Sequence, residues 1–202
     1  MKKRYKLVLL LFISFILTLF IYKCLYHPSK IYVSMGSDLN YGMSTFSYLD
    51  YINDKYTNKG KSYHIKSSEN VADIYSSISS NVENCNYYIN NARLITIGLG
   101  SFELGNYSLL TREIKKDYLD NIKKIIIKIK ELTNANVILI DGNSKENNLS
   151  NMIKKLCEKY DIEYISIYTY ESSPLEINGY LSLRYTTHIN LYNYICNQKN
   201  DC

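Results

Sequence analysis

The sequence contains no tryptophan, and it carries no excess charge once its first thirty residues are set apart. Six of the 24 Lys and Arg residues lie within residues 1–30, which leaves 18 against 19 Asp and Glu residues in the rest of the chain. A nearly neutral domain lacks the basic surface that binds phosphate backbones, which argues against nucleic acid as a partner. Tryptophan is absent while Tyr, Ile, Lys and Asn, the residues of A/T-rich codons, are abundant, so we infer a low-GC bacterial source.

The cysteines lack any regular spacing. The five residues show none of the paired spacings that hold zinc, and an odd number does not form a disulfide framework. We therefore expect no metal site and no cofactor. Cys196 and Cys202 are close enough in sequence to pair. Cys24 is only a weak candidate for lipidation, because the Ile-Tyr-Lys before it is no lipobox.

No small-residue cleavage site follows the one long apolar run. Four basic residues precede a run from Leu7 to Tyr22 that no charge interrupts, and Lys23 closes it. This order is typical of a secretory signal, and the bulky residues after it favour an uncleaved signal anchor. We predict a single-pass anchor and linker over residues 1–29, with membrane lipid as its partner. The positive-inside rule places the domain of residues 30–202 on the extracytoplasmic side of the cell membrane.

Strand-like and helical patterns alternate through the rest of the chain. Strands are expected at residues 31–35, 62–66, 93–99, 136–140 and 163–167, and helices at 45–56, 70–80, 107–132, 145–160 and 188–196. The helix ending at Leu132 is the clearest, because Ile and Leu recur there every three or four residues with Lys on the opposite face. Residues 94–97 and 137–140 are dominated by apolar side chains, as in strands covered on both faces. The alternation predicts a three-layer α/β/α domain with a parallel, flavodoxin-like sheet.

Ligands of such sheets lie at the carboxyl ends of the strands. Asp38, Glu103 and Asp141 follow three of the expected strands, and with His188 they are candidates for an acidic pocket that takes a cation, a sugar or an amine. The alternative, which we favour, is that each is a solvated loop carboxylate or a helix N-cap.

The first expected strand runs into a glycine-bounded turn, Gly36-Ser-Asp-Leu-Asn-Tyr-Gly42. This segment resembles the first block of SGNH (GDSL-type) hydrolases, a strand followed by G-D-S-L-[ST]-x-G. The two glycines and Leu39 match that pattern. Ser37 and Asp38 stand in reverse order, so Asp38 occupies the position of the family's nucleophile.

Three further blocks resemble the family in the same order. Ser68 lies nearest the glycine whose N–H contributes to the family's oxyanion hole. Gly100-Ser-Phe-Glu103 resembles G-x-N-D, with Phe102 in place of the asparagine donor, and loss of one such donor reduces kcat about 10²–10³-fold. Tyr185-Thr-Thr-His188 resembles D-x-x-H, so the histidine is retained and the aspartate that would orient it is replaced.

The resemblance implies an acyl-ester hydrolase fold, with a carbohydrate or lipid ester or a glycan of the cell envelope as ligand. The three replaced positions favour a degenerate member that acts as a binding or scaffolding module of the cell envelope rather than cleaving esters. The alternative is an active, atypical esterase that uses Ser37, brought to the site by a local bulge, with His188. Two further possibilities concern Asp38: an ion pair with His188, which would raise the histidine pKa, and a direct role as nucleophile.

Overall fold

The computed structural model describes residues 12–19, 30–36, 47–57, 60–65, 70–100, 111–143, 148–172, 175–177 and 180–199. Five parallel strands form its central sheet, in the order β2-β1-β3-β4-β5. Their bounds are β1 Lys30–Met35, β2 Gly60–Ile65, β3 Ala92–Leu99, β4 Asn136–Asp141 and β5 Glu163–Ser166. The parallel sheet predicted from the sequence is confirmed, and each strand ends within two residues of its expected bounds.

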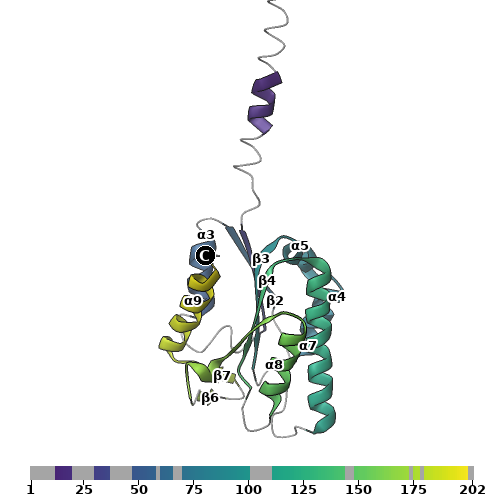
Figure 1. Ribbon diagram of the computed structural model, residues 1–202, viewed down its shortest axis with the longest axis vertical. Coiled ribbons are helices and arrows are strands. Elements are labelled where there is room, and N and C mark those ends of the chain that lie inside the picture. Colours follow the sequence, from purple (N-terminus) through teal and green to yellow (C-terminus); the bar gives the residue numbers. More distant parts are fainter. Residues whose placement is uncertain are drawn as a thin grey trace, which may run out of the picture.

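Helices cover both faces of this sheet (Figure 1). One face carries α3 (Tyr48–Thr57) and α9 (Tyr185–Lys199). The other carries α4 (Val71–Ser79), α5 (Cys85–Asn90), α7 (Arg112–Leu132) and α8 (Leu149–Lys159). The arrangement is the expected three-layer α/β/α architecture.

Some short elements differ from the sequence-based expectation. The last helix begins at Tyr185 rather than at His188, so the histidine lies in its first turn. The sequence did not predict several short elements. These are helix α5, the 3-10 turns η1 (Val82–Asn84) and η4 (Ile167–Thr169), and the hairpin of β6 (Leu175–Ile177) and β7 (Tyr180–Ser182). Elements of three to six residues are too short to show a hydrophobic period.

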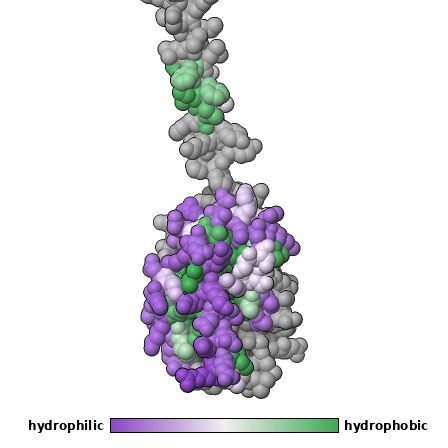
Figure 2. Space-filling model, turned by 90° about the vertical axis from the view of Figure 1, so that its right-hand side faces the viewer, coloured by the Kyte–Doolittle hydropathy of each residue, from purple (hydrophilic) through white to green (hydrophobic). Residues whose placement is uncertain are grey.

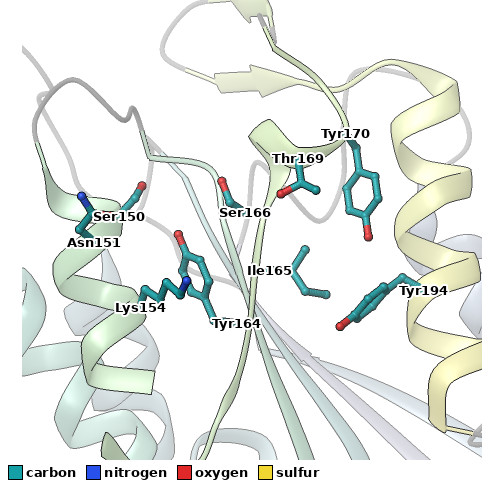
Figure 3. Close-up of a pocket in the computed structure, with 9 residues that line it drawn as sticks. All are labelled: Ser150, Asn151, Lys154, Tyr164, Ile165, Ser166, Thr169, Tyr170 and Tyr194. Carbon is teal, nitrogen blue, oxygen red and sulfur yellow. The ribbon is translucent and has the colours of Figure 1, made fainter. Parts of the chain in front are cut away.

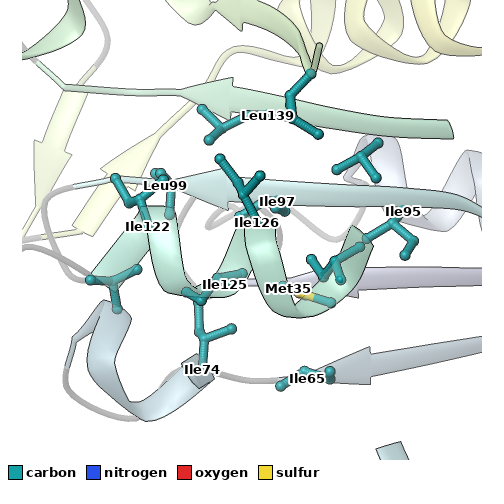
Figure 4. Packing of buried hydrophobic residues seen from close by; sticks show 14 of the residues in the cluster. Met35, Ile65, Ile74, Ile95, Ile97, Leu99, Ile122, Ile125, Ile126 and Leu139 are labelled. Atoms are coloured by element: carbon teal, nitrogen blue, oxygen red, sulfur yellow. The ribbon is translucent and has the colours of Figure 1, made fainter. Parts of the chain in front are cut away.

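Two apolar clusters hold the layers together, one on each face of the sheet. Successive residues of a strand point to opposite faces, so Leu94 packs toward α3 and α9 while Ile95 packs toward α7. Figure 4 shows Ile122, Ile125 and Ile126 of α7 lying over the strands of the sheet. The face of the domain seen in Figure 2 is largely hydrophilic, with separate small apolar patches.

The N-terminal segment is described only over residues 12–19, which are helical. Among the described residues, no helix combines the length and the hydrophobicity that a membrane span requires. The large apolar side chains of residues 12–19 are exposed (Figure 2). The other residues of the predicted anchor and linker, 1–11 and 20–29, lie outside the described residues.

Candidate functional site

A glycine directly follows the carboxyl end of each of the strands β1 and β3. Gly36 is buried and has a φ of 112°, which is unfavourable for residues with a Cβ. Its N–H donates to the carbonyl of Ile65 at 3.1 Å, so the turn after β1 is tied to the end of β2. Gly100, directly after β3, is also buried. The residues that the family's pattern places around these glycines (Ser37, Asp38, Ser68 and Glu103) lie outside the described residues.

Asp141 ends β4 in a buried network of hydrogen bonds. Its carboxylate accepts the backbone N–H of Asn143 at 2.9 Å, the side-chain Nδ2 of Asn143 at 2.7 Å and the hydroxyl of Tyr164 at 2.7 Å. Burial raises the pKa of Asp141 above its ordinary value, while these hydrogen bonds act in the opposite direction. Asp141 is therefore neither a solvated loop carboxylate nor a helix cap. Its oxygens are committed to neighbouring residues, which leaves it poorly suited to the acidic pocket considered above.

His188 lies in the first turn of α9, fully buried against the start of α3. Its Nδ1 accepts the backbone N–H of Tyr48 at 3.2 Å, and its ring stacks on the Tyr48 ring with centroids 6.1 Å apart. Tyr48 opens α3, where Ser47 and Asp50 also exchange hydrogen bonds in the manner of a capping box. His188 therefore satisfies one of the backbone donors at the N-terminus of α3.

This contact decides which nitrogen of His188 carries the proton. An amide N–H is only a donor, so the Nδ1 that accepts it is unprotonated, and in the neutral ring the hydrogen lies on Nε2. In a serine-hydrolase triad the reverse holds, because Nδ1–H donates to an aspartate and Nε2 takes the proton of the nucleophile. In the observed geometry, Nε2 of His188 is a donor, the opposite of its state in a resting triad.

The surroundings of His188 also disfavour its charged form. Burial lowers the pKa of His188 below the ordinary value, and the carboxylates of Glu171 and Asp50 oppose this effect without overcoming it. The positive end of the α3 dipole acts in the same direction as burial. Asp38 lies outside the described residues, so its ion pair with His188 stays a prediction.

Tyr185, at the position of the family's aspartate, lies at the surface. Its side chain is exposed, and its hydroxyl accepts a hydrogen bond from the hydroxyl of Tyr51 at 2.7 Å. Tyr185 thus pins the start of α9 to α3 and, among the described contacts, does not orient the imidazole.

Glu171, a buried carboxylate beside His188, was missed from the sequence. Its Oε2 accepts the backbone N–H of Arg184 at 3.0 Å and the hydroxyl of Thr187 at 2.9 Å, and Oε1 lies 3.4 Å from Nε of Arg184. A carboxylate beside the first turn of α9 is favoured by the helix dipole. No local pattern marks it, because the partner residues lie 13 and 16 positions further along the chain.

His64 is hydrogen-bonded inside the sheet. Its Nδ1 lies 2.5 Å from Oγ of Ser34, its register partner on β1. Ser34 is only 3% exposed, and the pair joins neighbouring residues of β1 and β2 within the sheet. Among the described residues, no three His, Cys, Asp or Glu side chains are grouped as a metal ion would require.

Comparison with solved structures gives the class of fold. The chain is similar to the lipase Lip_vut3 from a goat rumen metagenome, with 16% identity and a TM-score of 0.56 over 81% of this chain and 96% of that one. It is also similar to a member of the lipolytic protein G-D-S-L family from Veillonella parvula (11% identity, TM-score 0.57, 85% and 98% covered). A protein from Lactobacillus plantarum is similar at 10% identity, with a TM-score of 0.58 and 86% and 99% covered.

Comparison of the sequence alone identifies no relative. No protein-family model matches it, and no curated protein does. The structural likeness nevertheless covers nearly the whole of each neighbour, so the chain has the fold of SGNH/GDSL-type hydrolases.

Proposed function

We propose that this protein is a membrane-anchored, extracytoplasmic SGNH-hydrolase-like protein that binds an envelope ligand and has lost ordinary ester hydrolysis. The observation that carries the proposal is the hydrogen bond from the Tyr48 N–H to Nδ1 of His188, which makes Nε2 a donor. The sequence adds Asp38 at the nucleophile position, and Phe102 and Tyr185 in place of the family's asparagine and aspartate.

The ligand that suits this site is an ester or glycan of the cell envelope. Nε2 of His188 has no hydrogen-bond partner among the described residues and would donate to an ester carbonyl or a sugar oxygen rather than activate a nucleophile. Such a site retains recognition of the family's ligands without their cleavage.

The second candidate is an active, atypical esterase in which Ser37 is the nucleophile. It is favoured by the buried His188 at the start of α9, where the family's pattern places its catalytic histidine. It requires the imidazole to release the Tyr48 N–H and move the proton to Nδ1.

Fluorophosphonate labelling of the full chain in detergent separates the two candidates, with an active serine hydrolase as the positive control. The proposal expects no covalent adduct by mass spectrometry and no turnover of acetylated sugars or short-chain lipid esters. Stoichiometric labelling of Ser37, lost in His188→Ala, would establish the esterase instead.

The anchoring part of the proposal rests on the charged start of the chain and the uncharged run from Leu7 to Tyr22. The disulfide-bonded state of Cys196 agrees with an oxidising, extracytoplasmic location. In a bacterial host, the full chain is expected in the membrane after alkaline carbonate extraction, with its C-terminal domain open to protease in spheroplasts. Release by carbonate, or full protection from protease, would contradict the anchor and leave the site proposal untouched.

A further inference from the structure

A cavity of about 470 Å³ lies at one edge of the sheet, and neither Gly36 nor His188 lines it. Figure 3 shows its walls: α8 on one side, Tyr170 and Tyr194 on the other, and residues 164–166 of β5 between them. Both helical layers of the domain therefore border the same cavity.

The cavity follows the outer edge of β5. This strand is last in the sheet order, and among the described strands it pairs only with β4. Three consecutive residues of β5 line the cavity, although successive side chains of a strand point to opposite faces. Tyr164 packs on the cluster that includes α8, and Ile165 belongs to the cluster that includes α9. Only a groove along the strand edge meets both faces in this way.

The two sides of the groove differ in chemistry. The α8 side presents Asn151 and Lys154, and Lys154 is the one charged side chain among the described residues that line the groove. The hydroxyl of Tyr164 on this side is committed to Asp141.

The α9 side is more apolar. It presents Ile165 and the rings of Tyr170 and Tyr194, and Tyr194 hydrogen-bonds Glu163 through its hydroxyl. A ligand on this side would therefore meet mainly rings and aliphatic carbon.

We propose that this β5-edge groove binds an extended peptide segment of a partner protein as an added sixth strand. An open sheet edge offers unpaired N–H and C=O groups, and strand addition uses them for affinity while alternate side chains give specificity. The bound segment places an acidic side chain against Lys154 and the next, apolar side chain against Tyr170 and Tyr194. This inference does not depend on whether the candidate site cleaves or binds esters.

The first test uses the full chain in detergent and a fluorescein-labelled peptide of alternating Glu and Val, blocked at both ends, with binding followed by anisotropy. Two further peptides carry N-methyl groups on all Glu amides or on all Val amides. Alternate N–H groups of an added strand face the sheet, so one methylated peptide should lose binding while the other binds within about threefold of the parent. No binding by the parent, or equal behaviour of the two methylated peptides, would overturn the proposal.

The second test is a charge reversal with a matched control. Lys154→Glu is expected to weaken binding of the Glu–Val peptide by about tenfold or more, because like charges then face each other. The same variant should bind a Lys–Val peptide, whose charges are opposite to the new glutamate. Lys155→Glu changes an exposed neighbour on α8 that does not line the groove, and should leave both affinities within about twofold. Equal effects of the two variants would refute a specific contact. A dimer in sedimentation that excludes the peptide would assign the edge to a second copy of the chain and likewise overturn the proposal.

Discussion

At the scale of the residue, Gly36 and His188 set the geometry of the candidate site. Gly36 allows β1 to turn at a φ of 112° while its N–H stays bonded to the end of β2. His188 is held by a backbone amide on one side and lies beside the buried carboxylate of Glu171. Gly36 matches the family's pattern in sequence. Nδ1 of His188 accepts a hydrogen bond, whereas the corresponding Nδ1–H of a catalytic triad donates one.

Gly36→Ala is expected to destabilise the domain by about 1–2 kcal/mol, because a Cβ is unfavourable at positive φ. The free energy of unfolding from urea titration checks this. Gly60→Ala is the control, because among the described residues Gly36 is the one glycine with a positive φ. The Gly60→Ala substitution should lower the free energy of unfolding by less than about 1 kcal/mol. Equal losses in the two variants would contradict the assigned role of the turn.

The pH dependence of stability should reveal the neutral state of His188. Its folded pKa is lowered, so between the folded value and the ordinary value near 6.5 the unfolded chain binds more protons. The free energy of unfolding should therefore rise with pH up to about 6.5 and then level off, with a slope from this residue of at most about 1.4 kcal/mol per pH unit.

His188→Asn isolates this effect, because the amide oxygen can accept the Tyr48 N–H and does not titrate. Urea titrations at several pH values should show a shallower slope in the variant than in the parent. Parallel curves, or a parent whose stability falls as pH rises through this range, would exclude a buried neutral histidine.

At the scale of the element, the sequence predicted best where a hydrophobic period or run is long. The apolar runs of β3 and β4 and the helical period of α7 located these elements, because burial on one or both faces dictates their residues. The three-residue strands β6 and β7 carry no such period. The contact of Glu171 with the start of α9 was equally unpredictable, since its partners are distant in sequence.

Helix α7 offers a matched pair of neighbouring isoleucines. Ile126 is fully buried against the sheet, whereas Ile127 is 36% exposed. Ile126→Ala should lower the free energy of unfolding by about 2–5 kcal/mol, through lost burial and the cavity left behind. Ile127→Ala should cost about 1 kcal/mol or less in the same urea titration. A reversed order would mean that α7 packs on the sheet through another face.

At the scale of the whole molecule, the parallel topology gathers the candidate site from distant parts of the chain. The start of α3 and the start of α9 meet beside the carboxyl ends of the strands, although Tyr48 and His188 are 140 residues apart. The fold could be predicted from the sequence because it follows from the order of the elements. The protonation of His188 could not be predicted from the sequence. It depends on the backbone N–H of Tyr48, a group that every residue except proline carries.

The most direct test of this account is the tautomer of His188, read from long-range ¹H–¹⁵N NMR correlations of the full chain in detergent at neutral pH, with assignment by His188→Asn. The account predicts a neutral ring with the proton on Nε2 and an unprotonated, hydrogen-bonded Nδ1. A proton on Nδ1 with a free Nε2 would restore the arrangement of a working triad and contradict the claim that this hydrolase fold has lost its general base.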